Sequence, residues 1–220
     1  GLIGNVGVAS FDGGKIITTG EGGMITTNDA ELASRLRRFR NHGIDPAARE
    51  RQRHTEGQWY YEMTELGYNY RLPDIACALG VTQLEKLPDN ISRRREIVRQ
   101  YTDALAELPG VVTPVERPEV QSAWHLYSIR LDLSKLTAGR KEVFQALRAE
   151  NIEVNVHYIP VHLHPYYRQT FGYKGGECPV AEAAYESLVT LPLFSSMTSR
   201  DVEDVVDAVH KVVEHYQVPR

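Results

Sequence analysis

The stretch SFDGGKIITTGEGGMITT, residues 10–27, places a single lysine, Lys15, among glycines and small hydroxyl residues. Five glycines lie between Gly13 and Gly23. Glycine adopts backbone angles closed to other residues and lets a ligand approach the main chain closely. The pattern matches neither the GxxxxGK(S/T) nor the GxGxxG phosphate-binding motif. The stretch by itself therefore leaves two interpretations open, a tight turn with a solvated lysine and a ligand site.

Short alternating segments flank this lysine. NVGVASF before it and GGMITT after it combine small and β-branched residues between glycines. This pattern predicts two strands with Lys15 on the loop at their ends. The following NDAELASRLRRFRNHG predicts a helix capped by Asn28 or Asp29. Its apolar stripe consists of Leu32, Leu36 and Phe39.

The middle of the chain is rich in aromatic residues and then becomes helical. Residues 45–57 are polar and predict a surface loop. QWYYEMTELGYNYRLPDIACALG, residues 58–80, is typical either of an interface or ligand rim or of an aromatic cluster that holds a loop to the core. Residues 73–108 predict helix with a break at Pro88. Glycine and prolines at 109–118 indicate a domain boundary.

The last hundred residues carry their own α/β pattern. HLYSIRLDL predicts a strand that places Tyr127, Ile129, Leu131 and Leu133 on one face. GRKEVFQALRAEN predicts a helix, and IEVNVHY predicts a second strand with His157 on the face opposite its apolar residues. The closing SRDVEDVVDAVHKVVEHY predicts an amphipathic helix that begins at a capping box of Thr198 and Asp201.

Composition narrows the class of protein. The 220 residues, 42% of them hydrophobic, predict a globular protein, and the net charge of −4 gives no general attraction to nucleic acid. No apolar run reaches the roughly 20 residues that span a bilayer, and we expect no membrane partner. Two cysteines form no disulfide framework, so we expect a cytoplasmic protein. The first residues are apolar and alternating without an initiator methionine, so we expect a piece that starts inside a domain.

Three histidines in VNVHYIPVHLHPYY raise the question of a metal site. The spacing of His157, His162 and His164 fits no familiar zinc motif, and no cysteine pair or HExxH accompanies it. We therefore expect no metal. Histidines on a proline- and tyrosine-rich loop suit hydrogen bonds to sugar hydroxyls or phosphates, or acid and base chemistry near neutral pH. Solvated loop histidines are the alternative.

Several segments together resemble one known family. SFDGGKIITTGEGGMITTND, RLRRFRNHGI, WYYEMTELGYNYRLPDIACALGVTQLEKL, RRREIVRQY, SAWHLYSIRLD and VNVHYIPVHLHPYYR resemble, in the same order, the DegT/StrS-type pyridoxal phosphate (PLP) sugar aminotransferases. Within that family WYYEMTELGYNYRL and NVHYIPVHLHPYYR are most similar to the pseudaminic acid pathway transaminases. The resemblance implies an α/β protein, the C-terminal portion of a fold-type I PLP aminotransferase. Residues 1–88 would end the large PLP-binding domain, 89–112 would form a connecting helix, and 113–220 would form the small α/β domain.

The resemblance also implies roles for individual residues. Lys15 would bind the PLP aldehyde covalently and shuttle the proton during amino transfer, which requires its neutral amine. Ser10 matches a serine that contacts the cofactor phosphate. Asn69 matches an asparagine that reaches the phosphate in the neighbouring subunit, and Arg71 follows closely. The protein would then be a homodimer with a shared active site.

The expected substrate follows from the same resemblance. The amino group would pass, with glutamate as the probable donor, to C4 of a UDP-linked 4-keto-6-deoxy amino sugar for a bacterial surface glycan. The region lining the sugar nucleotide would contain His157, Tyr158, His162 and Tyr166.

Two departures from the family pattern keep alternatives open. Asp12 and Gly13 replace the usual histidine and proline, which adds negative charge near the cofactor. The part expected to hold the carboxylate for the pyridine nitrogen lies upstream of these residues. One alternative is an aminotransferase for another nucleotide 4-keto sugar of the perosamine type, and a second is a non-catalytic dimerisation remnant. The family's dehydratase relatives carry histidine in place of the lysine, so Lys15 argues against that activity.

Overall fold

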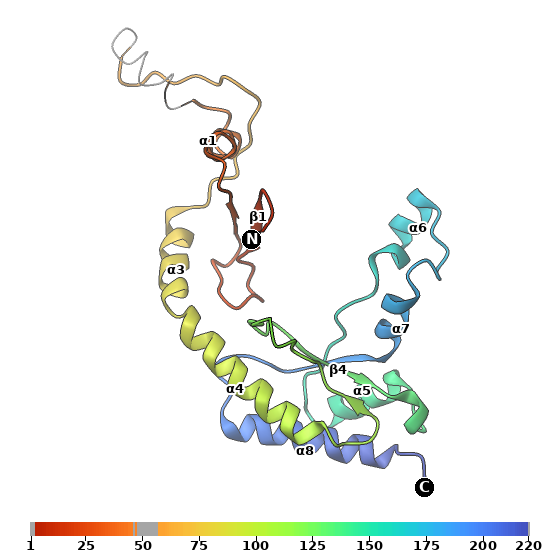
Figure 1. Ribbon diagram of the computed structural model, residues 1–220. Helices are drawn as coiled ribbons and strands as arrows, with labels where there is room; N and C mark the ends of the chain where they lie inside the picture. Colours follow the sequence, from red (N-terminus) through yellow and green to blue (C-terminus); the bar gives the residue numbers. More distant parts are fainter. Residues whose placement is uncertain (1–2, 46, 48–56, 220) are drawn as a thin grey trace. The chain divides into compact units, whose positions relative to one another are not determined.

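The computed structural model describes residues 3–45, 47 and 57–219 (Figure 1). The chain forms two compact units, Gly1–Leu87 and Pro88–Arg220, called here the first and the second unit. Most of the expected surface loop at 45–57 lies outside the described residues. The assignment of the three predicted domains to parts of an aminotransferase stays a prediction.

The first unit begins with an antiparallel hairpin of β1 (Gly7–Ser10) and β2 (Gly23–Thr26). Ser10 pairs with Gly23 at the end of the hairpin, so the loop that carries Lys15 lies where the sequence predicted it. The first unit also contains α1 (Ala30–Phe39) and α3 (Asp74–Glu85). Asp29 caps α1, as expected, by accepting a hydrogen bond from the main-chain N–H of Leu32.

Main-chain hydrogen bonds join the end of α1 to the aromatic segment. Asn41 and Asn69 form an antiparallel bridge, and Ile44 and Met63 form another. The ring of Tyr68 lies 5.0 Å from that of Phe39 and also stacks on Tyr70 at 5.0 Å. These rings pack the segment against the end of α1 and remain exposed, so they are compatible with both roles that the sequence left open for its aromatic residues.

The second unit is built on a three-stranded antiparallel sheet with the order β3-β4-β5. The strands are β3 (Val111–Val112), β4 (Tyr127–Leu131) and β5 (Leu188–Leu191). Tyr127, Ile129 and Leu131 are buried on one face of β4, which confirms the predicted alternation. Leu133 instead lies in a short 3-10 helix, Leu133–Lys135.

Three helices complete the core of the second unit, namely α4 (Leu87–Leu105), α5 (Arg140–Ala149) and α8 (Ser199–His215). A new helix starts at Leu87, so Pro88 occupies a first turn, where its missing N–H costs nothing. The predicted capping box of Thr198 and Asp201 begins α8. In Figure 1, α4 and α8 run beside each other, and the His210 ring Nε2 donates to the main-chain oxygen of Ala104 at 3.0 Å.

Residues 152–187 connect α5 to β5. They include the 3-10 helix η2 (Val161–Leu163), α6 (Pro165–Phe171) and α7 (Pro179–Ser187). The second strand predicted at residues 152–158 is wrong, because only Asn155 makes a bridge there, to Thr190. β5 pairs with β4 along one edge and meets Asn155 at Thr190 on the other, so residues 152–158 pair with the sheet at one residue only. No helix among the described residues is long and apolar enough to cross a membrane.

Candidate active site

The lysine loop is held by hydrogen bonds within itself. The Phe11 N–H donates to Gly22 O at 2.8 Å, and the Thr19 N–H donates to Phe11 O at 3.0 Å. The Thr18 hydroxyl donates to the same Phe11 oxygen at 3.0 Å. Gly20 has φ +82°, and a Cβ at Gly22 would collide with the Thr19 hydroxyl, so both positions favour glycine. Hydrogen bonds and glycine geometry thus define the conformation of this loop.

The turn before Lys15 uses Asp12. An Oδ1 of Asp12 accepts a hydrogen bond from the Gly14 N–H at 3.0 Å, and Asp12 O accepts one from the Lys15 N–H at 3.0 Å. The Ser10 hydroxyl oxygen accepts from the Asp12 N–H at 3.4 Å. The Lys15 side chain is exposed, and within the described residues its amine makes neither a hydrogen bond nor an ion pair. Asp12 thus shapes the turn and leaves the amine unpaired.

Asn69 and Arg71 lie together elsewhere in the first unit. The Arg71 Nη1 donates to Asn41 Oδ1 at 2.9 Å, and the main chain of Asn69 bridges to Asn41. Both Asn69 and Arg71 are exposed. Asn41 therefore contacts the main chain of Asn69 and the side chain of Arg71. Among the described residues, neither Asn69 nor Arg71 makes a hydrogen bond or ion pair with Lys15.

The predicted sugar-site residues all lie in the second unit. The Nδ1 of His157 lies 3.0 Å from the hydroxyl of Thr190. The ring of Tyr158, which is 67% exposed, stacks on that of His164 at 5.7 Å between centroids. Tyr166, also 67% exposed, meets Tyr167 edge to face at 5.5 Å. Exposed rings of this kind offer stacking surfaces to a planar ligand group.

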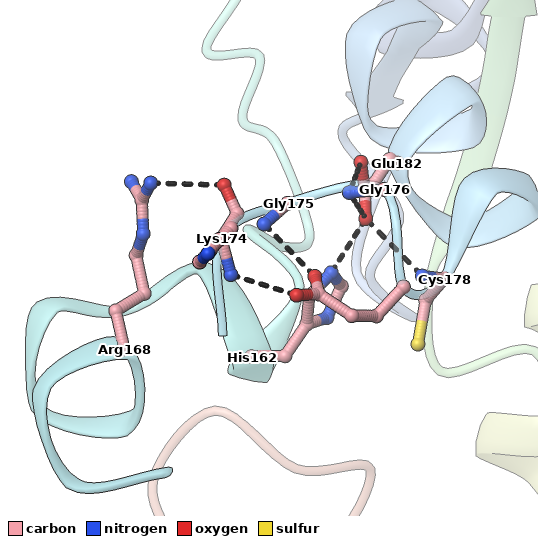
Figure 2. Close-up of polar contacts among 8 residues, drawn as sticks. His162, Arg168, Lys174, Gly175, Gly176, Cys178 and Glu182 are labelled. Atoms are coloured by element: carbon pink, nitrogen blue, oxygen red, sulfur yellow. Dashed lines mark hydrogen bonds and ion pairs between the residues drawn. The ribbon is translucent and has the colours of Figure 1, made fainter. Parts of the chain in front are cut away.

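His162 differs from these three residues because its side chain is only 11% exposed and its Nε2 is occupied. Figure 2 shows Nε2 directed at Glu182, whose Oε1 lies 2.7 Å away. Glu182 also accepts from the main-chain N–H groups of Gly176 and Cys178 at 2.9 and 3.2 Å. A contact between His162 and a ligand would therefore have to use Nδ1.

A second carboxylate completes this group. Glu177 accepts from the N–H of Lys174 at 2.7 Å and from that of Gly175 at 2.8 Å. The ligand atoms of His162, Glu177 and Glu182 lie within 4.8 Å of one another, which is close enough to share a metal ion. Both carboxylates already accept hydrogen bonds from main-chain N–H groups of residues 174–178, and Glu182 also accepts one from His162. We call His162, Glu177 and Glu182 together the Glu182 clasp.

These hydrogen bonds also set the charge of the clasp. The bond from His162 is the largest cause that lowers the pKa of Glu182, and the N–H groups of Gly176 and Cys178 add to it. The N–H of Lys174 likewise lowers the pKa of Glu177. Sequence reasoning missed both residues. The available signal was GYKGGECPVAE, in which glycines precede a helix with glutamate in its first turn.

Comparison with known proteins identifies the family. The DegT/DnrJ/EryC1/StrS aminotransferase family matches residues 1–210. The chain belongs to this family. Its members and structural neighbours are PLP-dependent sugar aminotransferases of fold type I, and the predicted fold class is therefore confirmed.

Individual members of the DegT/DnrJ/EryC1/StrS family are similar over most of this chain. The spore coat polysaccharide biosynthesis protein SpsC of Bacillus subtilis is 43% identical over 97% of the chain and 55% of its own length. The UDP-4-amino-4-deoxy-L-arabinose–oxoglutarate aminotransferase of Shewanella sediminis is 36% identical over 90% of the chain and 52% of its own length. The chain thus spans about half the length of these relatives.

Solved structures of family members are similar to this chain. Helicobacter pylori PseC, an aminotransferase involved in pseudaminic acid biosynthesis, has a TM-score of 0.85 and 29% identity over 96% of this chain and 54% of its own. The putative sugar aminotransferase Spr1654 of Streptococcus pneumoniae, in its pyridoxamine phosphate form, has a TM-score of 0.87 and 29% identity over 97% and 54%. The same protein is known in a PLP form.

The residues of the lysine loop fit the family's cofactor. The Lys15 amine is exposed and makes no hydrogen bond or ion pair among the described residues, so it is accessible to the aldehyde of the cofactor. The Ser10 hydroxyl at the end of β1 and the Arg71 guanidinium are donors of the kind that hold phosphate. Nothing in the described loop competes for the Lys15 amine.

Proposed function

We propose that this chain is part of a PLP-dependent sugar aminotransferase whose covalent cofactor site is Lys15. The observation that carries the proposal is the unpaired Lys15 amine on a hydrogen-bonded glycine loop, within a chain that the aminotransferase family matches over residues 1–210. When bound, PLP supplies the electron sink for amino transfer. Lys15 holds the cofactor, is released during each half of the reaction and carries the proton between cofactor and substrate carbon.

The other residues of the first unit hold the phosphate in this proposal. Ser10 donates its hydroxyl to the phosphate, and its oxygen keeps the turn at Asp12 in place. Asn69 and Arg71, which both contact Asn41, bind the phosphate of the neighbouring subunit. Both side chains are exposed, which supports contact with a neighbouring subunit.

The proposed substrate is a UDP-linked 4-keto-6-deoxy amino sugar that receives an amino group at C4 from glutamate. This would make the protein a UDP-4-amino-4,6-dideoxy-N-acetyl-β-L-altrosamine transaminase of bacterial surface glycan biosynthesis. The names of the Shewanella sediminis relative and of PseC support a UDP sugar, the glutamate/oxoglutarate pair and this pathway. His157, Tyr158 and Tyr166 offer a hydrogen-bonding ring and two exposed stacking rings for the nucleotide sugar, and His162 offers Nδ1.

The proposed assembly is a cytoplasmic homodimer. The described part of the first unit exposes large apolar side chains, among them Ile75 at 87% and Val8 at 80%, and a second copy is the partner that a shared site requires. Both cysteines are free, which fits a reducing compartment. Light scattering of the purified chain at increasing concentration should give twice the monomer mass, and Ile75→Glu should weaken that association.

Transfer of a nitrogen label tests the proposed activity directly. The chain is incubated with PLP, 15N-glutamate and a UDP-4-keto-6-deoxy-N-acetylhexosamine, and the nucleotide sugar is analysed by mass spectrometry. We expect the label in the sugar with the wild type and no label with Lys15→Ala. Lys86→Ala is the matched control, because Lys86 is the other lysine of residues 1–87.

Each outcome of the labelling experiment has a definite meaning. Label in the sugar that depends on Lys15 and not on Lys86 supports the proposal. Label in another nucleotide 4-keto sugar, such as GDP-4-keto-6-deoxymannose, and not in the UDP sugar would replace the proposed substrate and retain the reaction class. Equal label with wild type and Lys15→Ala would overturn the role of Lys15.

A further inference from the structure

His157 is connected to the sheet by two hydroxyl groups that the sequence did not single out. Its Nδ1 lies 3.0 Å from the Thr190 Oγ1, and that oxygen lies 2.8 Å from the Ser128 Oγ. Thr190 is only 4% exposed, on β5, whereas His157 is exposed. The three residues thus form a relay that runs from the sheet to the surface, here called the Ser128 relay.

The main chain holds the relay in register. The Asn155 N–H donates to Thr190 O at 3.0 Å, and the Thr190 N–H donates to Asn155 O at 2.7 Å. This bridge fixes the backbone two residues before His157 against β5. On the other side, Ser128 and Thr190 are directly paired across β4 and β5. The hydroxyl of Thr190 therefore has a fixed place from which to reach the ring.

The numbers of donors and acceptors indicate which group donates in each hydrogen bond of the Ser128 relay. If Ser128 donates to Thr190, then Thr190 donates to Nδ1, and both hydroxyl hydrogens are used. In the opposite direction Nδ1–H donates to Thr190 and Thr190 donates to Ser128. The Ser128 hydrogen then has no acceptor among the contacts of the described residues. The first direction leaves only Nε2–H of the exposed His157 without a partner, where water can accept it, whereas the opposite direction leaves the hydroxyl of the half-buried Ser128 without one, so we favour the first direction.

We infer that Thr190 and Ser128 are positioning residues that hold neutral His157 with its proton on Nε2. The outward nitrogen is then a hydrogen-bond donor, suited to an oxygen acceptor of a ligand. The identity of that ligand as a nucleotide sugar rests on the proposed function, whereas the protonated nitrogen does not. Thr190 acts through the ring and does not itself touch the ligand.

The tautomer can be measured without any ligand. The full chain is labelled with 15N-histidine, and long-range proton–nitrogen spectra are recorded in alkaline buffer, with His157 assigned by loss of its signal in His157→Gln. We expect a single Nε2–H form in the folded wild type and a mixture of tautomers in the urea-unfolded chain. Thr190→Val should return the folded chain to the mixture, and Thr190→Ser should restore the single form.

The variants also separate positioning from packing. Valine matches threonine in shape and suits a strand, so Thr190→Val should keep the fold. In the labelling assay it should raise KM for the nucleotide sugar about twofold, because a mixture of tautomers roughly halves the fraction of His157 that carries Nε2–H, and leave KM for glutamate unchanged. An Nδ1–H form in the folded wild type would overturn the inference. So would identical spectra of the wild type and Thr190→Val.

If the wild type transfers no label, the proposed function fails by itself. A single Nε2–H form that is lost in Thr190→Val would still support the relay, and the two failures are therefore distinguishable.

Discussion

The two units of this chain differ in how far their apolar side chains are buried. The second unit buries a continuous core that includes Tyr101, Leu105, Ile129 and Val209, each at 0% exposure. None of the apolar side chains described in the first unit is buried, and Ile75 is 87% exposed. Hydrogen bonds define the local structure of the first unit, whereas the hydrophobic effect dominates the second. We therefore expect the second unit to be stabilised mainly by its own core, and the first unit to gain stability when its exposed apolar side chains are covered.

The largest effect should come from matched leucine truncations in the two units. Leu105→Ala removes a fully buried side chain and should lower the free energy of unfolding by about 3 kcal/mol. Leu84→Ala removes a side chain that is 55% exposed and should cost much less, about 0.5 kcal/mol beyond helix propensity. Urea unfolding followed by far-UV circular dichroism measures both. Equal costs would contradict the contrast between the units.

The second prediction concerns a buried charge in the second unit. The Arg94 Nη1 donates to the main-chain oxygens of Trp124, His125 and Leu193 at 3.0–3.2 Å, and burial lowers the pKa of Arg94. Arg94→Met leaves these oxygens without that donor and should cost about 2 kcal/mol.

Arg99→Met, on the same helix and exposed, is the control and should cost little. In a Trp59→Phe background, Trp124 is the sole tryptophan and its fluorescence reports unfolding of the second unit alone. A loss no larger than that of Arg99→Met would mean that the core holds these loops without Arg94.

The third prediction is the pH dependence of the Glu182 clasp. The folded pKa of Glu182 lies below its ordinary value, so the folded state binds the proton less readily than the unfolded state. The stabilisation is therefore complete above the ordinary carboxyl pKa and is lost as pH falls through the lowered folded pKa. Glu182→Gln should be less stable than the wild type at neutral pH, and the difference should shrink in acid. A difference that stays constant with pH would contradict this account.

The sequence predicted those features that local pattern determines. The hairpin, the caps of α1 and α8, and the buried face of β4 all follow from residues adjacent in the chain. The failure at residues 152–158 has a tertiary cause. Alternation there matched a strand, but only Asn155 pairs with the sheet, through a single bridge to Thr190 on the free edge of β5. The pattern of a short apolar segment cannot show whether that segment pairs with a sheet.

Some residues of the candidate site could be predicted from the sequence and others could not. A glycine-rich loop singled out Lys15, and its resemblance to a family supplied Ser10, Asn69 and Arg71. Nothing local marked Thr190, whose contact with His157 joins residues 33 apart in the chain, and the local glycines before Glu182 could not show its bond to His162, 20 residues away. Equally, the pattern could not show that Asp12 would bind the Gly14 N–H. Long-range hydrogen bonds are thus the part of a site that a single sequence hides.

The most direct test of the central claim is the mass of the chain after incubation with PLP and reduction with borohydride. We predict one covalent adduct in the wild type and in Lys86→Ala, located on the peptide that contains Lys15, and no adduct in Lys15→Ala. An adduct that persists in Lys15→Ala, or a wild-type chain that forms none, would contradict the assignment of Lys15 as the cofactor lysine.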